Sequence, residues 1–120
     1  MDPNLVEDLI TDKTKAITVV DFAGHPADLD AFRSICDKHG LFLIEDAAHS
    51  IGSLYKGKPV GSIADLTTFS FFPTKNFTTG EGGAVSSTNA SLLDLARKFG
   101  RQGLVRDPEK FKNKVDGRWQ

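Results

Sequence analysis

The sequence predicts an α/β fold, a partial three-layer α/β/α sheet that is mostly parallel and contains one antiparallel strand. A strand, a helix and a second strand follow one another over residues 16–46, which is the order of a parallel βαβ unit. A third apolar strand is expected over residues 66–72. Only ten residues then precede a fourth strand at 83–87, barely enough for a helical parallel crossover, so these two strands are expected to be antiparallel.

The first elements are indicated by caps and by apolar spacing. Asp2 as N-cap, with Pro3 at the first helical position, predicts a short amphipathic helix. A strand follows over residues 16–22. Asp28 is expected to cap a second helix, which Gly40 ends.

The middle of the chain combines apolar runs with turn residues. Residues 41–44 form a nearly unbroken apolar run, typical of a parallel strand covered on both faces, and Glu45 and Asp46 follow at its end. Residues 55–60 are expected to form a small hairpin that turns at Lys56 and Gly57. This hairpin leads to the strand at 66–72.

A third helix is predicted over residues 89–99, ending at Gly100. Beyond Gly103 the apolar pattern fades. We therefore expect residues 1–103 to form one partial domain and residues 104–120 to be a basic tail, poorly ordered or truncated.

Composition excludes several classes of protein. With 120 residues, 39% hydrophobic and 26% charged, the chain fits one globular domain. No apolar run approaches the roughly 20 residues needed to span a bilayer, and Met1 to Asn4 lack the basic start of a secretory signal, so we expect a cytoplasmic protein with no membrane partner. The single cysteine, Cys36, excludes an intrachain disulfide and a zinc site of paired thiolates, and we expect it in the core.

Charge is distributed unevenly between the two parts of the chain. Residues 1–50 hold four basic and ten acidic side chains, and residues 51–120 hold eleven and six, which gives net charges of −6 and +5. Basic segments can bind nucleic acid, but here acids are mixed in and no aromatic stacking platform accompanies them. We expect no nucleic-acid partner.

The first candidate for chemistry is the end of the apolar strand at 41–44. Asp46 lies where ligands bind in open α/β sheets, at the carboxyl end of a strand, and His49 follows three residues later. Glu45, Asp46 and His49 could together bind a divalent metal, but no distant histidine pattern completes the set, so no metal is expected. A solvated turn is the alternative interpretation.

The second candidate is the segment 70–83. Lys75 follows an apolar strand among phenylalanines, where desolvation would make its amine a usable nucleophile. The glycines at 80–83 indicate either an anion-binding nest or a tight structural turn. Neither a nucleotide P-loop, nor the dinucleotide glycine spacing, nor the hydrolase G-x-S-x-G motif occurs. An acid at a strand end, an apolar lysine and hydroxyls near a glycine-rich turn match the needs of an aldehyde cofactor with a pyridinium ring and a phosphate.

These segments resemble the DegT/StrS family of pyridoxal-phosphate-dependent sugar aminotransferases. The matching segments are FAGHPAD (22–28), EDAAHSIG (45–52), YKG (55–57), GS (61–62), FSF (69–71), KNFTTGEGG (75–83) and RQG (101–103). The resemblance covers nearly the whole chain. It implies part of the large domain of an aspartate-aminotransferase-like, PLP-dependent transferase fold.

The resemblance also assigns residue roles. Lys75 is implied as the catalytic Schiff-base lysine that binds pyridoxal 5'-phosphate and then shuttles a proton. Asp46 is implied to pair with the pyridine nitrogen and keep it protonated, and Ser70 to hydrogen-bond the phosphate. His49 would lie against the ring or its phenolic oxygen, where many relatives have glutamine. Some relatives with histidine there aminate carbon 4 of the sugar, which favours a 4-keto substrate.

The implied reaction moves an amino group from an amino-acid donor, expected to be glutamate, to a keto-sugar nucleotide. Family dehydratases have histidine in place of the lysine, so Lys75 favours transamination. Family members are much longer and build their sites between two subunits, so the isolated 120-residue chain is expected to be inactive. The alternative is a truncated, non-catalytic binding or structural domain. We expect a homodimer or strand-edge association through the apolar strand at 66–72.

Overall fold

The computed structural model describes residues 1–103, which fall into two compact units, residues 1–88 and the unit that begins at Asn89. The predicted tail at 104–120 lies outside the described residues.

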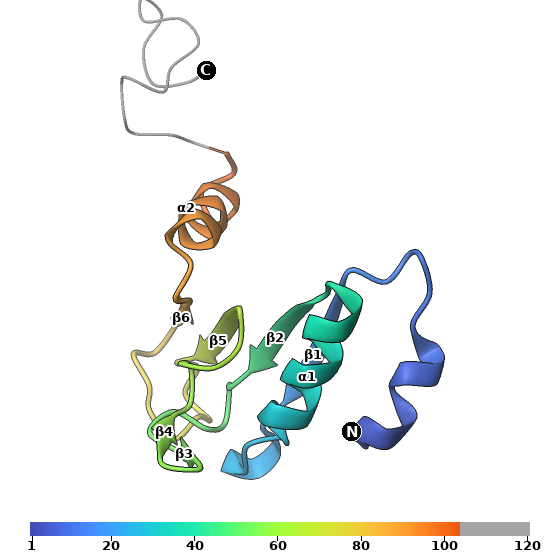
Figure 1. Ribbon diagram of the computed structural model, residues 1–120. Helices are drawn as coiled ribbons and strands as arrows, with labels where there is room; N and C mark the ends of the chain where they lie inside the picture. Colours follow the sequence, from blue (N-terminus) through green and yellow to red (C-terminus); the bar gives the residue numbers. More distant parts are fainter. Residues whose placement is uncertain (104–120) are drawn as a thin grey trace, which may run out of the picture. The chain divides into compact units, whose positions relative to one another are not determined.

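The first unit contains a four-stranded sheet in the order β1-β2-β5-β6 (Figure 1). The strands are β1 (Ala16–Val20), β2 (Phe42–Asp46), β5 (Leu66–Ser70) and β6 (Gly83–Ser86). β1, β2 and β5 are parallel, and β6 is antiparallel to β5. The α/β class and the mostly parallel sheet with one antiparallel strand are therefore confirmed.

The strand at 66–72 differs from its prediction in two ways. It ends at Ser70, and it is an interior strand with β2 on one side and β6 on the other. The expectation that this segment offers an open edge for association is wrong, because both of its edges are already hydrogen-bonded.

Helix α1 (Leu29–His39) lies across β1 and β2, as Figure 1 shows. Asp28 caps it as predicted, since its Oδ1 accepts a hydrogen bond from the backbone N–H of Ala31 at 3.3 Å, and the helix ends at Gly40. The helix buries three side chains against the sheet, and the core cluster on this face is Val6, Ile17, Val19, Leu29, Phe32, Cys36, Leu41, Leu43 and Ala64. Cys36 is fully buried, as expected.

The opposite face of the sheet is more open. Phe42 at the start of β2 is 51% exposed, and Val20 and Val85 are exposed as well. The apolar run at 41–44 thus reflects one face that packs on α1 and one face that is only partly covered.

The N-terminal segment is not the amphipathic helix that the spacing predicts. It forms two 3₁₀ turns, η1 (Pro3–Leu5) and η2 (Glu7–Leu9), although Asp2 caps the first of them as expected. Leu5 and Leu9 stay 65% and 75% exposed. A short α-helix in water needs its apolar stripe buried, but of the four apolar residues here Val6 is buried in the core and Ile10 packs against it only partly buried.

Strand β1 ends at Val20, two residues earlier than predicted, because a third 3₁₀ turn, η3 (Phe22–Gly24), bends the chain there. The hairpin forms as predicted, from β3 (Leu54–Tyr55) and β4 (Lys58–Pro59). The Tyr55 hydroxyl donates to Asp28 Oδ1 at 2.7 Å, which ties the hairpin to the start of α1.

The second unit contains α2 (Ala90–Phe99), which confirms the third predicted helix. Asn89 caps it by accepting from the N–H groups of Ser91 and Leu92. An ion pair between Lys98 and Asp94, one turn apart, spans 3.0 Å. None of the helices within residues 1–103 is long and apolar enough to cross a membrane.

Candidate active site at the carboxyl edge of the sheet

The carboxyl ends of β1, β2 and β5 meet at one edge of the sheet, and Asp46 is the last residue of β2. In the parallel register Asp46 pairs with Val20 on one side and with Thr68 on the other. Side chains alternate along a strand, so Asp46 projects to the face opposite α1, while Glu45 projects beneath α1. The Asp46 Oδ1 accepts a hydrogen bond from the Ala48 N–H at 3.0 Å, which holds the half-buried carboxylate at this edge of the sheet.

Ser70 lies at the same edge, at the end of β5 and two residues beyond Thr68. It therefore shares the face of Asp46. Its Oγ accepts a weak hydrogen bond from the Phe72 N–H at 3.4 Å, and no acceptor for its O–H occurs within residues 1–103. The hydroxyl is thus available to donate to a ligand.

Lys75 lies in the loop that leaves this edge between β5 and β6, and the loop folds back on its own beginning. The N–H of Lys75 donates to the Phe72 carbonyl at 2.9 Å, and the Thr78 hydroxyl donates to the Phe71 carbonyl at 2.9 Å. The Asn76 amide donates to the Ile51 carbonyl at 3.2 Å. This last bond ties the lysine loop to the loop that follows Asp46.

The surroundings of Lys75 are more open than the sequence predicts. The side chain is half-buried, but Phe72 and Phe77 are 45% and 53% exposed. The Phe77 ring packs edge-on against Phe71, with centroids 5.4 Å apart, rather than closing over the lysine. Desolvation of Lys75 by its own loop is therefore incomplete.

His49 is exposed and lies on the turn after Asp46. Its ring contacts the ring of Phe22, edge to face with centroids 6.1 Å apart. Gly24 lies close to this turn, because a Cβ added there would come within 3.2 Å of the His49 carbonyl oxygen, and its φ of +82° also favours glycine. The turn carrying His49 is thus packed against the segment that follows β1.

The structure brings Asp46, Ser70 and Lys75 to one edge of the sheet, with His49 on the adjoining turn. Within the described part of the chain, none of the four side chains hydrogen-bonds another of them. A carboxylate, a hydroxyl with a free hydrogen and an amine are the donor and acceptor types that a pyridinium nitrogen, a phosphate and an aldehyde need. The residues present therefore fit pyridoxal phosphate.

The metal alternative is not favoured by the same geometry. Glu45 and Asp46 project to opposite faces, and Glu45 is fully buried beneath α1. No group of three metal-ligating side chains occurs within residues 1–103.

Sequence reasoning missed a buried polar layer directly beneath this edge. Asp21, Glu45, Ser50 and Thr67 are fully buried on the α1 side of the sheet. Asp21 Oδ2 accepts from the Ser50 hydroxyl at 2.8 Å, and Glu45 Oε2 accepts from the Thr67 hydroxyl at 2.7 Å. The alternation of side chains along a strand could have predicted this layer, because Asp21 continues the α1-facing side of β1 on which Val19 lies.

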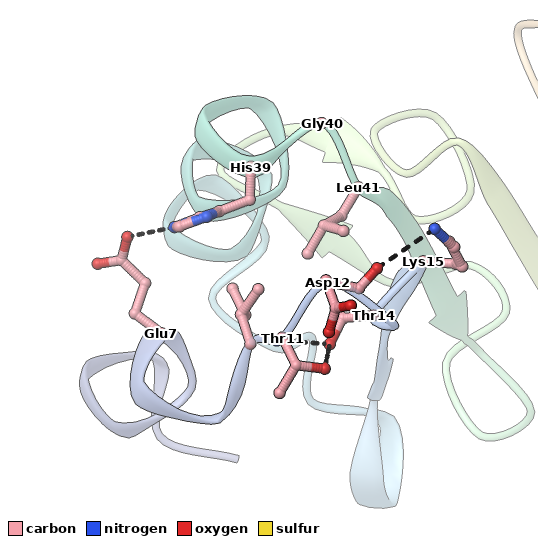
Figure 2. Close-up of a pocket in the computed structure, with 9 residues that line it drawn as sticks. Glu7, Thr11, Asp12, Thr14, Lys15, His39, Gly40 and Leu41 are labelled. Atoms are coloured by element: carbon pink, nitrogen blue, oxygen red, sulfur yellow. Dashed lines mark hydrogen bonds and ion pairs between the residues drawn. The ribbon is translucent and has the colours of Figure 1, made fainter.

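An open, polar pocket of about 470 Å³ lies near the amino ends of β1 and β2 (Figure 2). His39 and Glu7 face each other across it, with Nε2 and Oε1 2.7 Å apart. Lys38 and His39 together hold the pKa of Glu7 below its ordinary value. Because ligands of open parallel sheets bind at the carboxyl ends of the strands, we do not assign the site to this pocket.

Comparison with known proteins identifies the family of the chain. The family model of the DegT/DnrJ/EryC1/StrS aminotransferases matches residues 1–118, so the chain belongs to this family. Solved members of the family include PLP-dependent aminotransferases, and the fold described above matches the corresponding part of those structures.

Three relatives illustrate the likeness. GDP-perosamine synthase of Escherichia coli O157:H7 is 48% identical over 100 residues, which are 83% of this chain and 28% of that protein. The structure of Helicobacter pylori PseC, an aminotransferase of pseudaminic acid biosynthesis, superposes with a TM-score of 0.84 at 35% identity, over 94% of this chain and 30% of that one. The structure of DesI, determined in the presence of its TDP-sugar product, has a TM-score of 0.82 at 39% identity, over 86% and 26%. The chain thus spans less than a third of each of these relatives.

Proposed function

We propose that this chain supplies the cofactor-binding edge of a PLP-dependent aminotransferase that moves an amino group from an amino acid, glutamate, to a keto-sugar nucleotide. The observation that carries the proposal is the placement of Asp46, Ser70 and Lys75 at one carboxyl edge of the sheet, in a chain that belongs to a sugar aminotransferase family. Relatives named for GDP- and TDP-sugars support a nucleotide-sugar substrate.

Each residue has a role that its position supports. Asp46 would accept a hydrogen bond from the pyridine nitrogen and keep it protonated, because a nearby carboxylate favours the charged form of the base. The Ser70 hydroxyl would donate to the phosphate. The Lys75 amine would bind the aldehyde carbon and afterwards hold the proton that moves between the amino-acid donor and the cofactor. His49 would lie beside the ring, and its presence supports a 4-keto sugar.

Pyridoxal phosphate, when bound, supplies an electron sink that stabilises negative charge on the donor carbon. The open surroundings of Lys75 support the further proposal that other segments complete the site. A homodimer would supply a second wall from its partner subunit, and a longer chain would supply one from its own residues. We also propose that the protein acts in the cytoplasm and that residues 1–103 form part of the large domain of the fold.

The test is chemical labelling of the purified chain. The chain is incubated with pyridoxal phosphate, reduced with borohydride and digested, and the modified peptide is identified by mass. We expect label on Lys75 in the wild type, none at that position in Lys75→Ala, and unchanged labelling of Lys75 in Lys58→Ala, which removes an exposed lysine of the hairpin. Asp46→Asn should weaken the labelling.

A second candidate function is a non-catalytic binding or structural domain derived from the same family. The exposure of Phe72 and Phe77 beside Lys75 favours it, because an isolated site open to water binds its cofactor weakly. Label spread over many lysines, or equal in the wild type and Lys75→Ala, would support this candidate and overturn the first.

A further inference from the structure

The buried layer beneath Asp46 contains two carboxyl groups on neighbouring strands. Asp21 follows the last residue of β1, and Glu45 pairs with Val19 in the register of β1 and β2, so both side chains project to the α1 face within two residues of each other. Both are fully buried. Two ionised carboxylates at this spacing and burial would repel each other strongly.

Their hydrogen bonds differ in one respect. Both Asp21 oxygens accept, Oδ1 from the Ala27 N–H at 3.0 Å and Oδ2 from the Ser50 hydroxyl at 2.8 Å. Glu45 Oε2 accepts from the Thr67 hydroxyl and from the Gly61 N–H at 3.1 Å. Glu45 Oε1, which is also buried, receives no hydrogen bond from the described part of the chain.

An ionised Glu45 would leave a charged oxygen buried and without a hydrogen bond, which proteins strongly avoid. A protonated Glu45 removes the problem, because Oε1–H becomes a donor and each Asp21 oxygen can accept a second bond. Burial raises the pKa of Glu45 above its ordinary value of 4.5, and so do the charge of Asp21 and the hydrogen bond that a protonated Glu45 can form with Asp21.

Within residues 1–103, no cation forms an ion pair with either Asp21 or Glu45. The ion pairs within residues 1–103 involve other acids, namely Glu7, Asp30, Asp37, Asp65 and Asp94. From α1, the charged Arg33 is held by Asp65 at 2.7 Å, and the side chains that this helix buries are Leu29, Phe32 and Cys36. The thiol of Cys36 stays neutral, since burial raises its pKa. From β5 and the loop before it, Thr67 and Gly61 present neutral donors.

We propose that Asp21 and Glu45 share one proton in the folded protein, and that this acid pair is the positioning device that holds the strand-end turn of Asp46 and His49. Through Asp21 the pair reaches Ser50 at the end of the turn, and the Asp21 N–H donates to the Asp46 carbonyl at 3.0 Å. Through Glu45 it reaches Thr67 on β5 and Gly61 before it.

The position of Gly61 requires glycine. Its φ is +93°, and a Cβ there would lie 2.8 Å from Cζ of Phe69, so only glycine places its N–H on Glu45 without a shift of the ring. The role of the pair in positioning Asp46 for a cofactor rests on the proposed function, whereas the shared proton does not.

The test is a pH titration of the cofactor-free chain by NMR, with ¹³C-labelled carboxyl groups and ¹⁵N-labelled amides. We expect the buried pair to lose its proton above pH 4.5, while Glu7 titrates below it. The amide signals of Ala27 and Gly61, which contact opposite members of the pair, should move with one common midpoint. In Glu45→Gln the transition above pH 4.5 should disappear.

A Glu45 carboxyl that ionises at or below pH 4.5, or Ala27 and Gly61 signals with separate midpoints, would overturn the shared proton. These outcomes do not depend on the proposed function, because no cofactor is present. Glu45→Gln keeps an acceptor for Thr67 and gains a donor for Asp21, so it should fold as the wild type does, whereas Glu45→Ala should lower the urea midpoint. With the shared proton established, equal Lys75 labelling in wild type, Glu45→Gln and Glu45→Ala would refute the positioning role alone.

Discussion

The carboxylate of Asp65 offers a quantitative test of how the central strands are held together. Asp65 precedes β5, and its Oδ2 accepts from the Leu43 N–H of β2 at 2.7 Å and from Arg33 Nη1 of α1 at 2.7 Å. One carboxylate oxygen thus joins three elements. Replacing Asp65 by alanine leaves the N–H of the fully buried Leu43 unpaired and removes one of two acid partners of Arg33, whose side chain is 25% exposed.

The magnitude follows from these two losses. A buried backbone donor without an acceptor costs about 1–3 kcal/mol, and a partly buried hydrogen bond to a charged group is worth about 1.5–3 kcal/mol. The two losses share one oxygen and are not additive, so we expect Asp65→Ala to lower the free energy of unfolding by about 3 kcal/mol. Asp65→Asn keeps an acceptor for Leu43 and should cost about 1 kcal/mol.

The matched control is Asp37→Ala, which removes the other acid partner of Arg33. That pair is 2.9 Å long, but Asp37 is 68% exposed and one helical turn away, so the loss should stay near 0.5 kcal/mol. Urea unfolding followed by far-UV circular dichroism measures all three variants, with unchanged m-values. Equal urea midpoints for Asp65→Ala and Asp37→Ala would refute the reasoning.

Three further outcomes are expected. Lys38 and His39 lower the pKa of Glu7, so the contribution of Glu7 to stability is present above the ordinary glutamate pKa of 4.5 and is lost as the pH falls through the lowered pKa. Glu7→Gln should therefore reduce the loss of stability at acid pH, measured as the free energy of unfolding in urea at several pH values. Cys36 is fully buried and its thiol pKa is raised by burial, so a thiol reagent should react slowly with the folded chain and rapidly in urea; equal rates would contradict its burial. Asn76→Ala should reduce borohydride-dependent labelling of the candidate lysine and leave the free energy of unfolding within about 1 kcal/mol, since its hydrogen bond is exposed.

Sequence reasoning predicted the sheet well because its signals are local. The caps Asp28 and Gly40 define α1, and the short connection after Ser70 identifies the antiparallel strand. The N-terminal helix was predicted wrongly because its spacing shows amphipathicity but not whether a partner surface exists for Leu5 and Leu9. The same limit explains why β5 was expected at an edge, since strand order depends on contacts far apart in the sequence.

For the site, the sequence predicted which residues gather at the carboxyl edge but not how enclosed they are. Phe72 and Phe77 flank Lys75 in sequence, yet the loop turns them outward. A run of apolar residues does not specify which of them will cover a neighbour. The buried acids were missed for a related reason, because Glu45 adjoins Asp46 in sequence and was grouped with it as a possible ligand.

The alternation of a single strand explains how two adjacent acids acquire different chemistry. Glu45 and Asp46 are consecutive, but one projects beneath α1 and the other to the open face. Burial beside Asp21 favours the neutral form of Glu45, whereas Asp46 is half-buried and keeps an N–H donor on its oxygen. A one-residue shift in the register of β2 would exchange these environments, placing Asp46 in the core and Glu45 on the open face. The packing of Leu43 in the core beneath α1 opposes that shift, so a residue that stabilises the sheet also determines which of the two carboxylates lies on the open face.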